Sequence, residues 1–396
     1  MKEMAKWKRR LVTAAPWSLL AAAIFAVPFA LLTVFKCPHW LNWVVGMVVP
    51  EWGLWFALLM AGSGVAALFF RHRHPVVTTA TVSLSIVAIV LFLKPTIQAW
   101  RLGGDLPTRL RAAFGPASPQ RAPFSLTAVL ERNPEPVPIE TMQYSGSLLL
   151  DFYRAVGRSP APCVIVLHGG GWIEGDRKDN GTKRPLNDWL ARRGYAVASI
   201  DYRLSPASIW PAPRDDVLAA MAYLRSHATA LGIDPSRFVL LGRSAGGQIA
   251  AATAYSAHDP GIRGVIVFYA PTDFRMTWDA SASADPNLRW GDVRPWLKMF
   301  LGGTPESAGA AYDSASATRL IDSGTPPTLL LQGRLDVNVM ERQNDLLAKR
   351  LADAGVPHLL VAPPWAAHGF DLVSFNSPGG QITTYTVDWF VSAVTR

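Results

Sequence analysis

The chain has 396 residues and a formal net charge of +9, of which residues 1–100 contribute +7 through nine Lys or Arg and two Glu. The remainder is nearly neutral and has no basic stripe interleaved with aromatic residues, so nucleic acid is excluded as an expected partner. Two cysteines, Cys37 and Cys163, do not suggest a disulfide and are too few for a cysteine metal site.

Three runs in the first hundred residues contain no charged side chain, namely 11–35, 52–70 and 76–93. Each is close to the roughly 20 apolar residues that a membrane-spanning helix requires. Three buried helices of a soluble protein would leave very little polar surface. The stretch 40–50 is also apolar, so the second span can begin before Trp52. We therefore predict a membrane region over residues 1–100 with three transmembrane helices, at about 11–35, 44–70 and 76–94.

Basic residues flanking these runs predict the orientation. Five Lys or Arg precede the first run and two Arg lie in the second connection, whereas the first connection has only Lys36 and an opposing Glu51. The positive-inside rule then predicts a cytoplasmic amino terminus and an extracytoplasmic chain after Leu93, in the periplasm or at the cell surface. The first run also resembles a secretory signal, but it is long for a signal core and two more runs follow it. We expect membrane lipids as partners.

Residues 101–136 contain six prolines, which fix φ and remove backbone donors. This segment is predicted to be a Pro-rich tether with short helices, such as 106–114. In that piece Leu106, Leu110 and Phe114 repeat at helical spacing. The piece is either an interfacial helix lying on the membrane or a helix that covers the entrance to a pocket.

From residue 137 onward, apolar strand-like runs alternate with helical ones. The expected strands are 137–145, 147–154, 163–167, 196–202, 238–241, 264–269, 327–332 and 358–362. This alternation predicts one α/β domain over 137–396, with a mostly parallel central sheet flanked by helices. Ligands of such sheets bind at the carboxyl ends of the strands.

The sequence GRSAGG at 242–247 directly follows the run 238–241 and precedes a small-residue helix. A strand that breaks at Gly-x-Ser-x-Gly into a helix forms a sharp turn that exposes the serine hydroxyl. A side chain at Gly242 or Gly246 would collide with the neighbouring strand or helix. Ser244 is therefore a candidate nucleophile. The pentapeptide alone also fits a glycine-rich strand-to-helix connection with no catalytic role. A nucleophilic serine additionally requires a base, an acid and an oxyanion hole at the ends of other strands.

Three such partners follow strands in the expected order. The run 163–167 leads into His168 and three glycines, and a glycine run lets a carbonyl oxygen approach backbone N–H groups, as an oxyanion hole requires. Asp336 follows the run 327–332, and His368 follows the run 358–362. The order Ser244, Asp336, His368 is the chain order of the α/β-hydrolase arrangement.

Other histidines and aspartates fit these roles less well. His258 follows the nucleophile helix too closely, His358 begins a strand, and His168 is better placed to brace the glycine loop than to act as base. Asp322 and Asp345 are alternatives for the acid, but neither directly follows a strand.

Together these pieces resemble the acetyl esterase/lipase branch of the α/β-hydrolase superfamily, near the hormone-sensitive-lipase-like and feruloyl-esterase-like carboxylesterases. The matching pieces lie at 168–172, 201–204, 232–235, 242–247, Asp336 and 368–370. They cover most of residues 137–396 and none of the membrane region. Many relatives carry a glutamate shortly after the sequence DYRLSP, whereas this chain has Ala207 and Ser208 there, so no acidic contact is expected.

The resemblance implies an α/β-hydrolase fold and a role for each matching residue. Ser244 would be the nucleophile, His368 the general base and then acid, and Asp336 the group that orients the imidazole. The oxyanion hole would consist of the N–H groups of Gly170, Gly171 and Ala245. This chemistry requires no metal ion and no organic cofactor.

The sequence thus predicts a membrane-anchored serine carboxylesterase or lipase that hydrolyses an acyl ester, either a small molecule or a lipid, through an acyl-enzyme. Residues 274–320 are long enough for a small cap over the pocket, or they only pack against the sheet. Candidate pocket residues are Trp172, Trp290 and Trp296. Two alternatives stay open: an acyltransferase or peptidase that uses the same triad on an envelope lipid, glycan or peptide, and a membrane scaffold with a vestigial site. The sequence predicts no oligomeric state.

Overall fold

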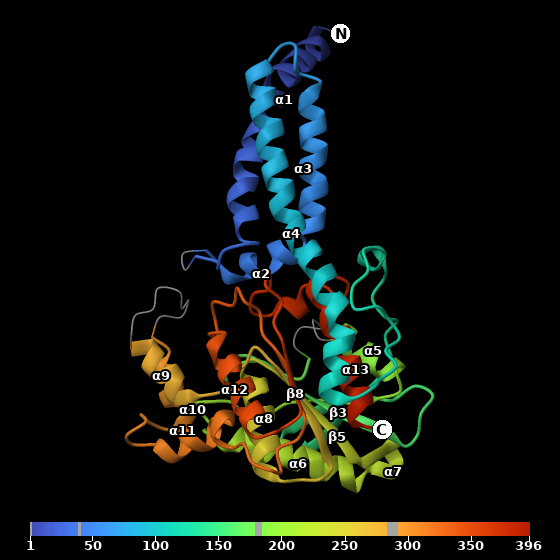
Figure 1. Cartoon of the computed structure of the whole chain (residues 1–396), viewed down its shortest axis with the longest axis vertical. Coiled ribbons are helices and arrows are strands. Elements are labelled where there is room, and N and C mark those ends of the chain that lie inside the picture. The colour runs from blue at the N-terminus through green and yellow to red at the C-terminus, as the bar shows by residue number, and fades with distance from the viewer. Residues whose placement is uncertain (1, 39–40, 179–183, 283–291) are drawn as a thin grey trace.

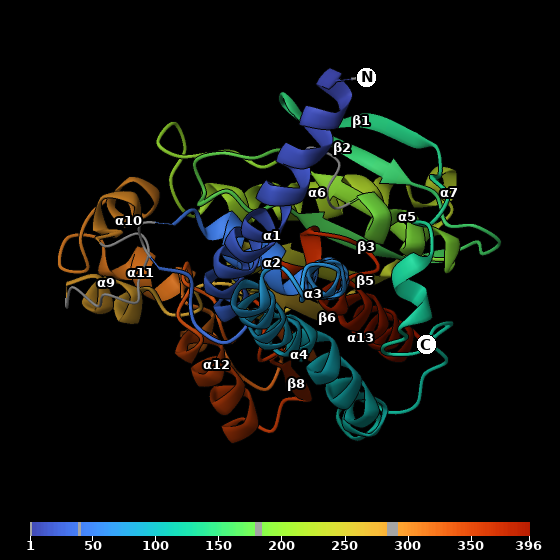
Figure 2. The ribbon, with the colours of Figure 1, turned by 90° about the horizontal axis from the view of Figure 1, so that it is seen from above.

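The structure of the chain, a computed structural model, describes residues 2–38, 41–178, 184–282 and 292–396. An elongated bundle of helices stands on a larger α/β part (Figure 1). The amino terminus lies at the far end of the bundle, and the carboxyl terminus lies in the α/β part. Seen from above (Figure 2), the bundle stands over the middle of the α/β part.

Helices from the first 114 residues form the bundle: α1 (Lys2–Leu31), α2 (Trp43–Glu51), α3 (Gly53–Leu68) and α4 (Pro75–Phe114). Small residues such as Ala30, Ala57 and Ala88 are buried between these helices, so their backbones approach closely. Large apolar side chains such as Phe25 and Val90 point outward and are more than 60% exposed. The bundle is therefore apolar outside as well as inside.

The segment predicted as one helix at 44–70 is broken into two helices. Helix α2 ends at Glu51, and α3 leaves it at an angle of 73°. The bend has a physical cause, because the Glu51 side chain is buried against the α/β part and holds α2 across the base of the bundle. Among the described residues, two helices, α1 over 13–31 and α4, are long and apolar enough to cross a membrane, and α2 with α3 makes a third only if the bent pair is counted as one span.

Helix α4 also differs from the prediction. The expected span was to end near 94 and the tether to begin at 101, but the helix continues without interruption to Phe114. Leu106 and Leu110 are completely buried in the core of the α/β part, which explains why the helix persists. This stretch therefore packs into the α/β part, and none of its residues lines the cavity around Ser244. The rest of the predicted tether is irregular apart from one short 3-10 turn, Thr127–Leu130.

In the described part of the chain, eight strands form one sheet in the order β1-β2-β4-β3-β5-β6-β7-β8. Their bounds are β1 Ile139–Ser145, β2 Leu148–Tyr153, β3 Ala161–Leu167, β4 Ala196–Ile200, β5 Ile233–Arg243, β6 Ile262–Phe268, β7 Thr328–Leu331 and β8 His358–Val361. The pairs β1–β2 and β2–β4 are antiparallel, and the others are parallel. The predicted mostly parallel sheet is confirmed.

Helices cover both faces of this sheet, because successive side chains of the buried strands point to opposite faces. Cys163 and Ile165 of β3 belong to a core cluster that also contains residues of α6, α8 and α12, whereas Val164 and Val166 belong to a second cluster with the end of α4, α5 and α13. The helix bounds are α5 Arg184–Arg192, α6 Ala212–Ser226, α7 Ala228–Leu231, α8 Ala245–Ala257, α9 Phe274–Ala282, α10 Arg294–Leu301, α11 Gly309–Ala315, α12 Arg342–Asp353 and α13 Pro378–Val394. Short 3-10 turns lie at Ala317–Arg319 (η3) and Phe370–Leu372 (η4).

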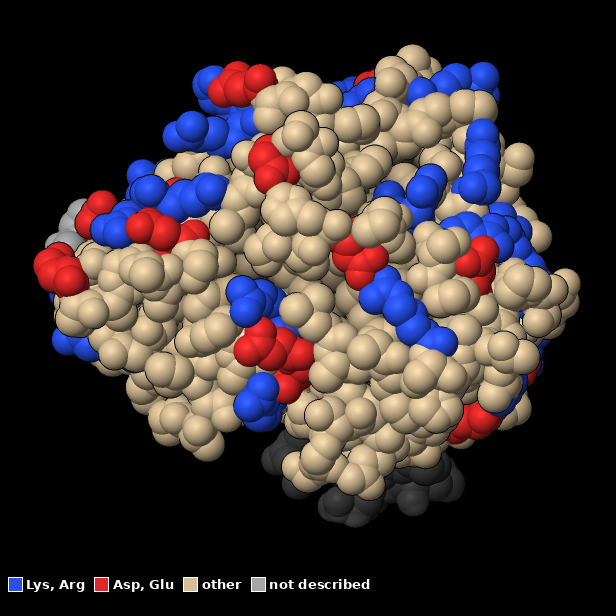
Figure 3. All heavy atoms as spheres, turned by 90° about the horizontal axis from the view of Figure 1, so that it is seen from below, with Lys and Arg blue, Asp and Glu red and all other residues tan. Residues whose placement is uncertain are grey.

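The face of the α/β part that is turned away from the bundle carries Lys and Arg interspersed with Asp and Glu (Figure 3). Ion pairs of the α/β part include Arg225 with Asp259 and Arg237 with Asp234. The opposite side, where the strands of the parallel sheet end, is turned toward the bundle (Figure 1).

Candidate active site

The turn between β5 and α8 holds Ser244 in a conformation with φ +51° and ψ −120°, which residues other than glycine rarely adopt. The two glycines around it are required by close packing. A Cβ at Gly242 would lie 2.1 Å from the carbonyl oxygen of Gly246, and a Cβ at Gly246 would lie 2.5 Å from that of Leu167 on β3. The predicted collisions with the helix and the strand are therefore confirmed, and Ser244 sits at the amino end of α8.

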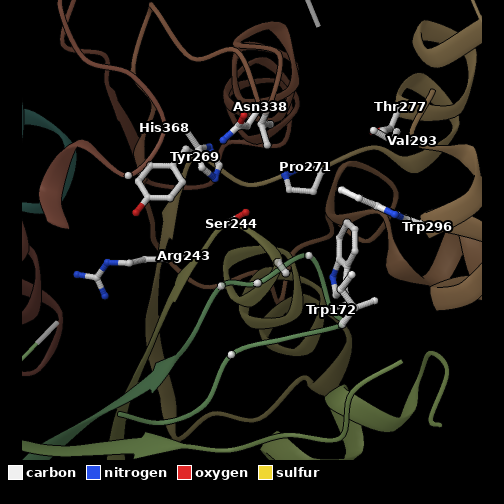
Figure 4. A pocket seen from close by; sticks show the side chains of 18 of the residues that line it. Trp172, Arg243, Ser244, Tyr269, Pro271, Thr277, Val293, Trp296, Asn338 and His368 are labelled. Carbon is white, nitrogen blue, oxygen red and sulfur yellow. The ribbon is translucent and has the colours of Figure 1, made fainter. Parts of the chain in front are cut away.

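Ser244 lies on a cavity of about 520 Å³ at the carboxyl edge of the sheet. The lining residues come from several loops and include Ser244, Ala245, His368, the glycine loop 169–171, Trp172 and Trp296. In Figure 4 the Ser244 hydroxyl points into the cavity beside His368, and Trp172 and Trp296 lie across from the histidine. The structure thus brings together residues that lie far apart in the sequence, such as the glycine loop and His368.

His368 and Asp336 form a direct contact below this cavity. The Nδ1 atom of His368 is 2.9 Å from Oδ2 of Asp336. The same carboxylate accepts hydrogen bonds from the side chain of Gln332 at 3.1 Å and from the backbone N–H groups of Asn338 and Val339 at 2.7 and 2.9 Å. Asp336 is buried, so these bonds replace the water that the carboxylate loses. Its orientation toward the imidazole is fixed from three sides.

The glycine loop lies against the turn that holds Ser244. A Cβ at Gly169 would be 3.4 Å from Cβ of Ser244, and one at Gly170 would be 2.0 Å from the carbonyl oxygen of Glu174. Gly170 has φ +114°. His168 lies beneath the loop with its ring stacked on Tyr202 at 4.1 Å, away from the cavity lining, so it braces the loop.

The residues predicted to line the pocket are only partly within the described chain. Trp172 lines the cavity while its indole N–H donates to Gln248 of α8 at 2.9 Å and its ring stacks on Phe300 at 4.6 Å. Trp296 also lines the cavity. Trp290 lies outside the described residues. The segment 274–320 forms α9, α10, α11 and η3, and it contributes both to the cavity wall and to packing against the domain.

The alternative acids and bases lie elsewhere. Asp322 is 3.6 Å from His258 in an exposed pair, and Asp345 pairs with Arg334 at 2.8 Å. Cys163 lies within β3, where burial raises the pKa of its thiol, so it is not a competing nucleophile.

One buried ion pair at the site has no counterpart in the sequence analysis. Nε of Arg243, the residue before Ser244, is 2.6 Å from Oδ2 of Asp371, which follows His368 by three positions. The hydroxyl of Tyr269 donates to Oδ1 of the same carboxylate at 2.7 Å, and the Tyr269 ring lies 4.4 Å from the His368 ring. This network joins the turn that holds Ser244 to the segment that carries His368. No local pattern predicts it, because the two charges are 128 residues apart.

Solved structures share this architecture. The chain superposes on a bacterial heroin esterase with a TM-score of 0.57 and 26% identity, over 74% of this chain and 92% of that one. An arylesterase superposes with a TM-score of 0.55 at 22% identity, over 68% of this chain and 90% of that one, which supports the fold alone. The fold is therefore the α/β-hydrolase fold.

Several sequence relatives of the chain are named as esterases or ester hydrolases. The chain is 26% identical to the probable carboxylic ester hydrolase LipM of Mycobacterium tuberculosis over 385 residues, 89% of this chain and 86% of LipM. It is 28% identical to the esterase LipC of the same organism over 261 residues, 63% of this chain and 62% of LipC. The protein is thus a serine esterase of the α/β-hydrolase superfamily. A family model described as BD-FAE matches residues 150–351, just over half of the chain, so the chain belongs to the BD-FAE family.

Proposed function

We propose that the chain is a membrane-anchored carboxylesterase in which Ser244, His368 and Asp336 form the catalytic triad. The observation that carries this proposal is the 2.9 Å contact of His368, which lines the same cavity as Ser244, with a buried Asp336 whose carboxylate also accepts hydrogen bonds from Gln332, Asn338 and Val339. The family membership supports ester hydrolysis, and the geometry supports these three residues for the roles.

The reaction follows from the hydrogen bonds of the imidazole. The Asp336 carboxylate accepts a hydrogen bond from Nδ1–H of His368, which leaves Nε2 of the imidazole to take the proton of the Ser244 hydroxyl. The serine oxygen then bonds to the ester carbonyl carbon, and the carbonyl oxygen becomes an oxyanion. Collapse expels the alcohol, which receives the proton from His368, and leaves an acyl-enzyme. Water attacks the acyl-enzyme, His368 takes its proton, and the carboxylic acid leaves as Ser244 regains its hydrogen.

The oxyanion needs donors that are already in place. Gly170, Gly171 and Ala245 are assigned to this role because all three line the cavity next to Ser244. The N–H of Ala245 belongs to the first turn of α8, where unpaired backbone donors and the helix dipole favour negative charge. Loss of one such donor typically costs about 10² to 10³ in rate.

The apolar part of the cavity lining suits an apolar acyl group. Val293, Trp296, Leu297 and Met340 line the cavity together with Trp172, whose indole N–H already donates to Gln248. An acyl ester, either a small molecule or a lipid, is the substrate class that this lining favours.

Membrane anchoring is supported by the apolar exterior of the bundle and by the two helices of spanning length. The basic amino-terminal flank favours a cytoplasmic amino terminus and an extracytoplasmic catalytic part. Fractionation followed by protease protection of intact cells tests this: the α/β part is expected to be digested from outside, and its protection would refute the orientation.

The triad is tested by labelling the full-length protein in detergent with a fluorophosphonate probe. Ser244→Ala is expected to abolish labelling and ester hydrolysis, whereas Ser281→Ala, which alters another serine on the cavity, is expected to keep both. Labelling that persists in Ser244→Ala would refute the assignment. A panel of nitrophenyl esters of increasing chain length, with and without sugar or amine acceptors, separates hydrolysis from acyl transfer.

A further inference from the structure

The amino-terminal region reaches the candidate active site through α2. We call residues 362–369, which connect β8 to η4 and carry His368, the histidine loop. Trp43, the first residue of α2, lies edge-on to the His368 ring at 5.9 Å between ring centroids and lines the cavity. Met47, one turn later, fills the space beside the loop, since a Cβ at Gly369 would lie 2.8 Å from its Sδ.

The last residue of α2 makes the polar part of this contact. Glu51 is buried, and its Oε1 accepts a hydrogen bond from the indole N–H of Trp365 at 2.9 Å. Its Oε2 accepts a hydrogen bond from the backbone N–H of Gly379, in the first turn of α13, at 2.7 Å. Trp365 is completely buried and lies in the histidine loop three positions before His368. One carboxyl group therefore ties the histidine loop to the start of α13.

A buried glutamate at the end of an apolar helix is costly unless its oxygens are satisfied. Here both oxygens have partners, and both partners belong to the α/β part, more than 300 residues away in sequence. The contact explains why α2 bends away from α3 and crosses the base of the bundle. Glu51 thus connects the two parts of the molecule at the histidine loop.

We propose that Glu51 is a positioning residue for His368, so that the active site depends on α2 of the amino-terminal region. This inference rests on the proposed roles of Ser244 and His368. Without the carboxyl group, the Trp365 indole N–H and the Gly379 N–H lose their acceptors, and the histidine loop must shift to regain partners. A misplacement of about 1 Å by a distant substitution can cost about 10² in rate.

The experiment compares full-length variants in detergent micelles by the rate of fluorophosphonate labelling at Ser244 and by kcat and KM for a short soluble ester, normalised to labelled sites. Glu51→Ala is expected to lower kcat and the labelling rate about 10-fold or more, with KM within about two-fold of the wild type. Trp365→Phe removes the donor and is expected to act in the same direction. The double variant is expected to be no slower than Glu51→Ala, because both changes remove one contact.

Matched variants separate positioning from a general effect on the bundle. Thr78→Val removes the hydrogen bond from α4 to Ala67 of α3, at a distance from α2, and is expected to leave kcat unchanged. Glu51→Gln keeps one acceptor oxygen and is expected to recover part of the rate, and it serves with Trp365→Phe if Glu51→Ala does not fold.

Two results would overturn the inference. The first is a labelling rate of Glu51→Ala within two-fold of the wild type, or the same result for Glu51→Gln and Trp365→Phe if Glu51→Ala does not fold. The second is a double variant in which the rate losses of the two single variants multiply. Failure of the proposed function gives a different result, since wild-type Ser244 itself would then remain unlabelled.

Discussion

Replacing Asp371 by Ala tests whether the buried pair with Arg243 stabilises the catalytic part. Both side chains are at most 3% exposed and their charged atoms are 2.6 Å apart. The substitution leaves the guanidinium buried without this carboxylate, and breaking such a pair costs about 3–5 kcal/mol. It also removes the acceptor 2.7 Å from the Tyr269 hydroxyl. For a domain of this size the loss corresponds to a fall in apparent Tm on the order of 10 °C.

The assay is thermal unfolding of the full-length protein in detergent, followed by intrinsic fluorescence, with ester hydrolysis measured in parallel. Asp353→Ala is the control, because its pair with Lys349 is exposed and such pairs contribute about 0–1 kcal/mol. Replacing both partners, as Arg243→Met with Asp371→Leu, is expected to recover most of the stability, since no lone charge stays buried. An apparent Tm of Asp371→Ala within about 2 °C of the wild type would refute the reasoning.

Three further outcomes are expected. In Asp336→Asn the amide oxygen is held by the backbone N–H groups of Asn338 and Val339, so the NH2 group faces Nδ1 of His368 and favours the wrong imidazole tautomer. We expect kcat to fall about 10³- to 10⁴-fold, and a loss below ten-fold in the steady-state rate would contradict the triad. Leu106→Ala should destabilise the protein by about 2–5 kcal/mol in denaturant titration because this side chain is completely buried; an unchanged midpoint would mean that the end of α4 is not docked. N-ethylmaleimide should leave hydrolysis unchanged at neutral pH, because burial raises the pKa of the Cys163 thiol and keeps the thiol protonated. Rapid inactivation that mass spectrometry traces to Cys163 would contradict this and would show that β3 opens.

The strands and the candidate site residues of the α/β part could be predicted from the sequence, because the patterns that indicate them are local. Apolar runs of strand length, each followed by glycine, serine, aspartate or histidine, predict both the strands and which side chains gather at one edge of the sheet. The close packing around Gly242 and Gly246 agrees with the motif that suggested it. The contact of Asp336 with His368 follows from topology, since β7 and β8 are neighbours.

The bounds of the amino-terminal helices could not be predicted as well, because contacts with the distant α/β part determine where these helices end. Hydropathy alone joins 44–70 into one span, whereas the partners of Glu51 break it. In the same way, prolines predicted an extended tether after 101, but burial of Leu106 and Leu110 keeps the helix intact. No pattern in the neighbouring sequence predicts the partners of Glu51 or the burial of Leu106 and Leu110.

The 40 residues of α4 rise about 1.5 Å each, so the helix is about 60 Å long, twice the roughly 30 Å hydrocarbon core of a bilayer. One element thus runs from the bundle to the flank of the sheet (Figure 1). In the proposed membrane-anchored arrangement, such a helix holds the cavity at a fixed height above the lipid. The cavity then cannot move freely toward and away from the membrane, as it would on a flexible linker. The enzyme would then search for esters by lateral diffusion, in two dimensions, within a thin layer whose depth is determined by the length of a helix.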